Sequence, residues 1–435
     1  MKVLIISAEV WQERANGGNV LSNIFDNMNW EFAQIYCNPG VPCNKICKKY
    51  YQMTDSMVLR NLFTHRPIGK KIEFNHFDDM NYESRMSVSD APEKANKKFY
   101  GFFHKYRWGV FFALRHMAWN ASNWKNDKLR TFVDEFEPDI IFAPCYGDKF
   151  MLRLTRYLAE HTGKKVISYI SDDSYTLRQF SLSPWFWFKR FIVRHELRKT
   201  FPYYSLVYTM TEAQLQQCKK DFGANMKILL KTTVFEQHEK SKEVNTPIRM
   251  VYAGGIYLQR WKTLKCIAEA LKRINSDNVK IRLDIYTANE ISSRVERHLN
   301  DGRNSFLHEC VTQGELAQIY QKSDIALHVE SFGLKNRLLV RMSFSTKIVD
   351  CLSSGCAVMA ICDEKQGGYQ YLKSEDAAIC INSLQHVERT IRRLTEHPVL
   401  ISVYQEKAQK CCDINHNRER IHNMIKDDFE TLVMS

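Results

Sequence analysis

No run of apolar residues in this sequence reaches the ~18 that a membrane-spanning helix needs, so we expect no transmembrane segment. The N-terminal stretch MKVLIISAEV is too short for a secretion signal and lacks a small-residue cleavage site. We therefore interpret it as a buried first strand and expect the protein in the cytoplasm.

Several ligand-binding patterns are also missing. No zinc-finger, homeodomain-like or RNP-type pattern accompanies the net charge of +13, which disfavours nucleic acid and leaves anionic membranes and phosphorylated ligands as partners. No GxGxxG follows a glycine-ended strand, which argues against a nicotinamide dehydrogenase. The 13 cysteines are scattered, and Cys43 and Cys47 have no second pair at zinc spacing. We expect reduced thiols and no metal site.

The chain has 435 residues, more than one hydrophobic core holds, so we expect two domains. Strand and helix patterns alternate twice along it, which predicts an α/β fold of two Rossmann-like, doubly wound domains facing a cleft. The predicted limits are 1–240 and 248–410, joined by a polar linker at 239–247. A polar helical segment, 411–435, is expected to close over the domain junction.

The first domain opens with a β-branched strand at 2–8, a turn at Gly17, Gly18 and Asn19, and a helix. The amides of that turn suit an anionic or hydroxyl-rich acceptor, although a purely structural turn has the same sequence. Further predicted strands lie at 33–37, 139–145, 165–171 and 205–210, and helices at 151–161 and 212–222. The polar stretch 75–98 is expected to be a loop.

The second domain opens with the strand VYAGG, which ends at Gly254 and Gly255 and is followed by Arg260 and Lys262. Two cations just after a glycine turn suit a diphosphate. The alternative interpretation is an ordinary solvated helix start.

The segment from Ser345 to Ala360 predicts a loop, a short helix, a glycine stop and a buried strand. Lys347 and Asp350 share one helix face. With the helix start in the cleft, Thr346 and Lys347 would meet phosphate and Asp350 a ribose hydroxyl. The alternative is a surface ion pair.

These blocks resemble the GT-B glycosyltransferases of family 4, especially bacterial enzymes that build capsule, exopolysaccharide or O-antigen. The resemblance covers nearly the whole chain and is carried by the GGN turn, EFEPDIIFAP (135–144), ISYISDD (167–173), VYTMTEA (207–213), VYAGG and STKIVDCLSSGCAVMAI (345–361). It implies a nucleotide-sugar donor, UDP- or GDP-linked, bound by the second domain, and a glycan or lipid-linked glycan acceptor. It also implies retention of configuration and no obligatory metal.

In that family, two glutamates separated by seven residues contact the sugar and the ribose. Asp350 occupies the place of the second acid, but Met342 stands in the place of the first. Glu330, at the start of a lengthened loop, is the candidate to replace it, and a merely solvated glutamate at a strand end is the alternative.

Asp172 and Asp173 follow a predicted strand, at the sheet edge where open α/β sheets carry ligand-facing groups. We expect one to orient or deprotonate the acceptor hydroxyl and the other to cap or support, with Asp173 as the catalytic member. Asp148 is a weaker candidate. Because other family members use a histidine in this domain, His104, His116 and His195 also stay open.

An aromatic and basic stretch covers residues 184–194, and 99–119 has the same character. As a helix it places three arginines on one face and aromatic residues elsewhere, and this combination of rings and cations suits an interfacial helix on an anionic leaflet. The residues are Trp185, Trp187, Arg190, Arg194 and Arg198. We expect peripheral binding at the inner face of the plasma membrane, and core packing under a basic surface is the alternative.

Two rival functions stay open. One is a nucleotide-sugar 2-epimerase on the same fold, and a donor-only turnover assay would identify it. The other is a catalytically silent glycan-binding or scaffold protein of a polysaccharide assembly complex, which the missing first acid makes plausible.

Overall fold

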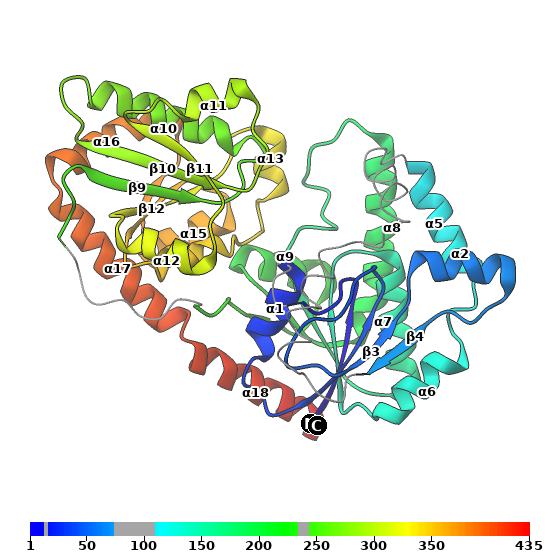
Figure 1. Ribbon diagram of the computed structural model, residues 1–435. Helices are drawn as coiled ribbons and strands as arrows, with labels where there is room; N and C mark the ends of the chain where they lie inside the picture. The colour runs from blue at the N-terminus through cyan, green and yellow to red at the C-terminus, as the bar shows by residue number, and fades with distance from the viewer. Residues whose placement is uncertain (13–15, 74–108, 234–242) are drawn as a thin grey trace.

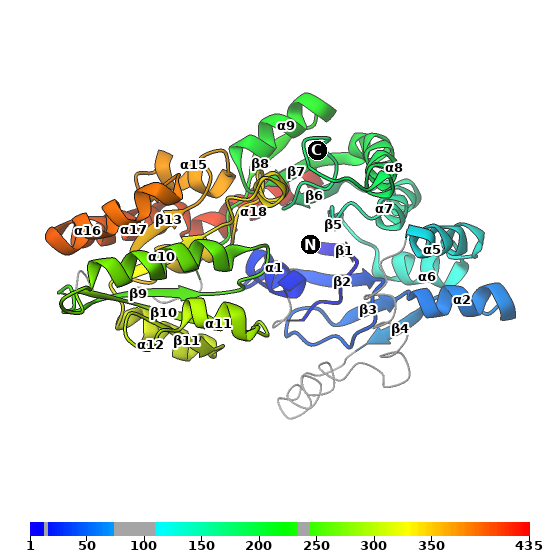
Figure 2. The ribbon, with the colours of Figure 1, turned by 90° about the horizontal axis from the view of Figure 1, so that it is seen from above.

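The computed structural model describes residues 1–12, 16–73, 109–233 and 243–435 (Figure 1). The loop expected at 75–98 and the first part of the aromatic stretch at 99–119 lie outside these residues. Two α/β domains stand side by side, each built on its own sheet, as the view from above also shows (Figure 2). The expected fold of two Rossmann-like domains is confirmed.

The first sheet is parallel except at one edge, where β4 runs antiparallel to β3. In spatial order its strands are β4 (Lys70–Glu73), β3 (Lys49–Gln52), β2 (Glu31–Tyr36), β1 (Lys2–Ser7), β5 (Ile140–Pro144), β6 (Val166–Ile170), β7 (Tyr204–Thr209) and β8 (Met226–Ile228). Alternate side chains of β1 enter two different cores, Val3 and Ile5 on one face and Leu4 and Ile6 on the other. Both faces are therefore buried, which is why KVLIIS reads as a continuous apolar run.

Helices connect and cover these strands. They are α1 (Asn16–Phe25), α2 (Asp55–Thr64), α5 (Gly109–Ala121), α6 (Asp127–Phe136), α7 (Lys149–Thr162), α8 (Pro184–Thr200) and α9 (Glu212–Phe222). The ends follow local chemistry: Thr211 caps the start of α9, and Gly223 ends it in the left-handed conformation.

The second sheet is wholly parallel. In spatial order its strands are β11 (Ser305–Glu309), β10 (Ile281–Thr287), β9 (Ile248–Ala253), β12 (Ile325–Val329), β13 (Ala357–Ile361) and β14 (Ile379–Ile381). Its helices are α10 (Arg260–Ile274), α11 (Ser293–Leu299), α12 (Gln313–Gln321), α13 (Leu334–Leu339), α14 (Lys347–Leu352), α15 (Gly367–Ser374), α16 (Val387–Glu396) and α17 (Val399–Asn415).

The last helix, α18 (Arg418–Met434), leaves the second domain and packs on the first (Figure 1, red). Its Phe429 ring lies 5.9 Å from that of Phe25 and 5.1 Å from that of Trp30. The Tyr208 hydroxyl donates to Asp428 at 2.8 Å. The chain thus crosses between the domains twice, once in each direction.

Each sheet reverses its strand order at one point, between β1 and β5 in the first sheet and between β9 and β12 in the second. Ligands of open parallel sheets bind at the carboxyl ends of the strands that flank such a point. All 13 cysteines are free thiols. Among the described residues no helix is long and apolar enough to cross a membrane.

Candidate active site

A cleft of about 900 Å³ lies between the two domains, at the carboxyl ends of the strands that flank both reversal points. The first domain contributes Glu9 after β1, Tyr146 after β5 and Asp172 after β6. The second contributes Glu330 after β12 and Lys347 at the start of α14. The cleft therefore collects residues that are far apart in the sequence.

Lys347 is the cation that projects into this cleft with no anionic partner among the described residues. Its ammonium lies 5.5 Å from the centre of the Tyr252 ring. A Cβ on Gly254 would collide with that ammonium, so the absent side chain of Gly254 makes room for it. Burial and the nearby Arg260 guanidinium lower the pKa of Lys347. An anion bound here would relieve both effects.

Arg260 and Glu330 form a buried bidentate ion pair. Arg260 donates from Nε at 2.9 Å and from Nη2 at 2.7 Å to the two carboxylate oxygens. The Thr263 hydroxyl donates to the backbone oxygen of Glu330 at 2.8 Å. The structure thus brings together two residues predicted for the donor site. It also corrects the expectation that Arg260 is free to neutralise phosphate, because its charge is already matched.

His328, which our sequence analysis missed, stands two residues before Glu330 in the same wall of the cleft. It is buried, and desolvation lowers its pKa to about 4, so the ring is neutral near pH 7. Its only sequence signal is its position at the end of a buried strand.

The remaining predicted donor residues divide into two groups. Thr346 is exposed and lines the cleft. The Asp350 carboxylate accepts from the Lys231 ammonium of the first domain at 3.0 Å, so its cationic partner is not Lys347, with which the alternative paired it. Lys262 is exposed, donates to the Gln259 side chain at 3.1 Å and lies outside the lining of the cleft. Its prediction as a phosphate ligand receives no support from the geometry.

Residues 263–426 match the family model of glycosyl transferase-like proteins. Sucrose-phosphate synthase from Thermosynechococcus elongatus is 12% identical over 99% of both chains, with a TM-score of 0.62. HepE from Anabaena is 11% identical over 99% of this chain and 100% of that one, with a TM-score of 0.60. TarM is 14% identical over 70% of this chain, with a TM-score of 0.52, and this chain spans only 57% of TarM.

The chain has the GT-B fold, and its residues 263–426 are similar to glycosyl transferase-like proteins. A comparison with curated protein sequences gives no significant match.

In this GT-B protein the two adjacent aspartates differ in position, and the enclosed one is Asp173, the residue predicted to face the acceptor. The Asp173 carboxylate is enclosed and accepts from the backbone N–H of Tyr175 at 3.3 Å and of Thr176 at 2.8 Å. It also pairs with the Arg190 guanidinium at 3.5 Å. Asp172 is exposed to the cleft and accepts from the Ser343 hydroxyl across it at 2.8 Å. Asp172 is therefore the carboxylate available to an acceptor.

The other proposed acids and bases are less suitable. Asp148 caps α7 through the N–H groups of Phe150 and Met151 and accepts from Arg115 at 2.9 Å. Burial alone would raise the pKa of Asp148, but these partners lower it below its ordinary value. His195 is exposed on α8 and His104 lies outside the described residues. Glu9, which our sequence analysis missed, lines the cleft instead.

The glycine turn predicted for Gly17, Gly18 and Asn19 lies within the first turn of α1, which begins at Asn16. Residues 13–15, which precede it, lie outside the described residues. The predicted contact of this turn with an acceptor stays a prediction.

The basic membrane face predicted on α8 is wrong for two of its three arginines. Arg190 is buried and donates to the backbone oxygens of Thr176 at 2.8 Å and Asp173 at 2.9 Å. Arg194 pairs with Asp221 at 3.5 Å, and only Arg198 is exposed. Helical spacing does place the arginines together, but Arg190 turns toward the buried carboxylate of Asp173, which requires a cation, and Arg194 toward the half-buried carboxylate of Asp221. Trp185 and Trp187 are half-buried.

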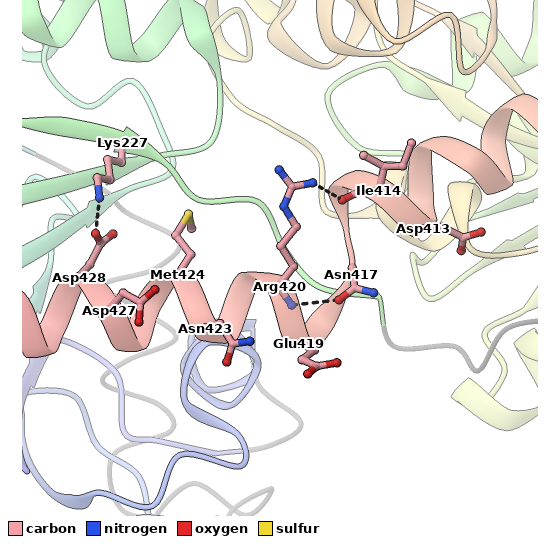
Figure 3. Close-up of a pocket in the computed structure, with 10 residues that line it drawn as sticks. All are labelled: Lys227, Asp413, Ile414, Asn417, Glu419, Arg420, Asn423, Met424, Asp427 and Asp428. Carbon is pink, nitrogen blue, oxygen red and sulfur yellow. Dashed lines mark hydrogen bonds and ion pairs between the residues drawn. The ribbon is translucent and has the colours of Figure 1, made fainter.

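A separate hollow of about 720 Å³ lies along the corner between α17 and α18 (Figure 3). Side chains of both signs line it, and Lys227 pairs there with Asp428. None of the predicted site residues borders this hollow.

Proposed function

We propose that this protein transfers a glycosyl group from a nucleoside diphosphate sugar to an acceptor hydroxyl held against the first domain. The observation that carries the proposal is the partly buried ammonium of Lys347, which has no anionic partner among the described residues, in a cleft that spans both strand-order reversal points. A leaving diphosphate is the anion that such a cation suits.

UDP is the nucleotide we propose first, and GDP the alternative. The solved structure of HepE is a complex with UDP, and so is one structure of TarM. The E. coli trehalose-6-phosphate structure is bound with UDP-2-fluoro glucose. These likenesses support the fold, and the transfer of their ligands to this chain is part of the proposal.

In the proposed arrangement the chain's own side chains supply the charges. Lys347 and the Thr346 hydroxyl meet the diphosphate, and no obligatory metal is required because the ammonium takes the electrostatic role of a cation. The Arg260–Glu330 pair shapes the sugar end of the site. Asp172 accepts the proton of the acceptor hydroxyl, or orients it. Retention of configuration follows from the family resemblance.

We further propose that the acceptor is a glycan or lipid-linked glycan in bacterial surface polysaccharide synthesis. The protein would then work in the cytoplasm, at the inner face of the plasma membrane. The exposed side chains of Phe188 and Phe191 on α8 support membrane proximity better than the arginines do.

Calorimetric titration of UDP and GDP in the presence of EDTA tests the donor assignment. Saturable binding of one nucleotide without metal supports it, and the matching sugar nucleotides are then assayed for hydrolysis and transfer. No binding of either nucleotide would refute the donor site. Binding without hydrolysis or transfer of any donor would favour the silent scaffold, whereas donor isomerisation alone would favour the epimerase.

A further inference from the structure

The turn between β9 and α10 holds two consecutive residues in a backbone conformation that is unfavourable for them. Leu258 has a φ of 54° and Gln259 a φ of 64°, both in the left-handed region that favours glycine. Strain of this kind persists only where surrounding contacts enforce it, and it gathers at ligand-binding sites. The turn follows Gly254 and Gly255 at the carboxyl end of β9, which flanks the strand-order reversal of the second sheet. Its shape therefore bears on the cleft.

Side chains from distant parts of the second domain enforce this turn. The Asn336 amide on α13 donates to the backbone oxygen of Leu258 at 2.6 Å. The side-chain oxygen of Asn289 accepts from the backbone N–H of Ile256 at 2.8 Å. Because α13 belongs to the lengthened loop that begins at Glu330, this loop has a definite task, which is to fix the turn on the donor side of the cleft.

The side chain that the turn presents is that of Tyr257. It lines the cleft and is 57% exposed. A Cβ on Gly255 would collide with the ring, so the absent side chain of Gly255 makes room for it. The Arg260 guanidinium lies 4.8 Å from the ring centre and is itself fixed by its ion pair with Glu330. A single exposed aromatic residue needs no explanation, but a ring held by strained backbone and fixed neighbours is prepared for a ligand.

We propose that the transferred sugar packs on the Tyr257 ring, which makes this tyrosine a specificity-determining residue for the donor. The inference rests on the proposed glycosyl transfer. The absent side chains of the adjacent Gly254 and Gly255 make room for the Lys347 ammonium and the Tyr257 ring, so the ring lies next to the place proposed for the diphosphate. A hexose joined to that diphosphate presents a flat face of C–H groups, and an exposed aromatic ring is a flat apolar surface that matches it.

The test is calorimetric titration of the full chain with UDP, UDP-glucose, UDP-galactose and UDP-N-acetylglucosamine, or with GDP and GDP-mannose if GDP is the nucleotide bound. The wild type should bind at least one sugar nucleotide more tightly than the free nucleotide. Tyr257→Ala should weaken binding of that sugar nucleotide about eightfold, because about 50 Å² of apolar surface then stays in water. The affinity for the free nucleotide should stay the same.

Two variants serve as controls for the ring. Tyr257→Phe keeps the ring and should bind both ligands as the wild type does. Phe63→Ala removes an exposed aromatic side chain on α2, outside the lining of the cleft, and should change neither affinity.

Two further variants test how the ring is held. Gly255→Ala places a methyl group where the ring lies and should weaken binding of the sugar nucleotide. Combined with Tyr257→Ala it should cause no additional loss, because both changes act through the ring. Asn336→Ala releases the backbone oxygen of Leu258 and should weaken the sugar nucleotide about threefold while sparing the free nucleotide. Circular dichroism checks folding, and Tyr257→Ala, at an exposed side chain, keeps the test valid if Asn336→Ala fails to fold.

An equal loss of both ligands in Tyr257→Ala would overturn the proposal and place the ring against the nucleotide instead. Unchanged affinity for the sugar nucleotide in that variant would overturn it as well, and so would additive losses in the double variant or a wild type that binds no sugar nucleotide more tightly than the free nucleotide. Failure of the proposed function has a different signature. Absence of UDP and GDP binding in the wild type would refute the whole donor site, whereas nucleotide binding with any of the other contrary results refutes only the sugar contact.

Discussion

Replacing Lys347 with Met removes the ammonium from the cleft and keeps a side chain of similar length and apolar character. In the free protein this ammonium has no anionic partner among the described residues, and burial lowers its pKa. Its described contacts are a cation–π approach to Tyr252 and packing against Gly254. The variant should therefore lose a ligand contact and, of the structural contacts, only the cation–π one.

The expected loss of binding follows from the charge. A hydrogen bond to a charged group contributes about 1.5–3 kcal/mol, so UDP affinity should fall about 10- to 150-fold. Stability should change in the opposite direction, because the wild-type protein holds a cation in a site that disfavours it. The lysine proposed to bind the phosphate therefore slightly destabilises the free protein.

The pH dependence of the free energy of unfolding provides a second, independent test of the environment of Lys347. Because the pKa of Lys347 in the folded protein lies below its ordinary 10.5, the unfolded chain binds more protons in the interval between these values. The contribution of Lys347 to the free energy of unfolding of the wild type should therefore rise with pH, by at most about 1.4 kcal/mol per pH unit, as the pH approaches 10.5. Lys347→Met should lack this component.

Titration calorimetry with UDP and chemical denaturation at several pH values measure these effects. Lys262→Met is the matched control, since Lys262 is exposed and lies outside the cleft lining. Unchanged UDP affinity in Lys347→Met, or an equal loss in both variants, would refute the assignment of the diphosphate to Lys347.

Two further predictions concern the acceptor side and the cleft wall. Asp172→Asn should lower turnover about 100-fold and leave the free energy of unfolding within about 0.5 kcal/mol of wild type. Asp173→Asn should lower the free energy of unfolding by about 3–5 kcal/mol, because Arg190 stays buried without its anion. Turnover assays and urea unfolding measure these effects, and the opposite result for the two variants would contradict the assignment. His328 has a pKa of about 4 in the folded state, so wild-type stability should fall as the pH drops from 6.5 toward 4, by up to about 3 kcal/mol. His328→Gln should remove the part of this pH dependence that comes from His328. The similar part that comes from His416 should remain. An unaltered pH profile would show that His328 is not the titrating group.

Much of the fold could be predicted because its strands are buried on both faces. The expected strands at 139–145 and 205–210 correspond to β5 at 140–144 and β7 at 204–209. Fully buried parallel strands give continuous apolar runs that stand out against the amphipathic helices between them.

The edge of the first sheet gave no such signal. β3 (KYYQ) and β4 (KKIE) have four residues each, and β4 is mostly exposed at the edge. Their formation depends on pairing with β2, a non-local contact that the local sequence does not encode. The helix α2 between them was missed together with these strands.

The candidate site, like the fold, could be predicted from the sequence only in part. The sequence motifs placed Lys347 and Gly254 in one site. They did not show that the ammonium of Lys347 occupies the space that a side chain at position 254 would fill. Which of Asp172 and Asp173 faces the cleft depends on the turn after β6, and the enclosed one was fixed by Arg190 seventeen positions later in the chain. An i, i+4 pattern of arginines has the same appearance whether it faces lipid or a buried carboxylate.

When the charged residues that already form ion pairs are set aside, the remaining charges of the cleft have opposite signs on the two domains. Three carboxylates already have cationic partners, in the pairs Arg260–Glu330, Lys231–Asp350 and Arg190–Asp173. Among the described cleft residues that leaves the Lys347 ammonium on the second domain, and the carboxylates of Glu9 and Asp172 on the first. Glycosyl transfer requires this division, because negative charge develops on the leaving diphosphate while the acceptor hydroxyl must give up a proton. The division arises from which charges the fold satisfies internally, so the missing first motif acid does not by itself exclude catalysis.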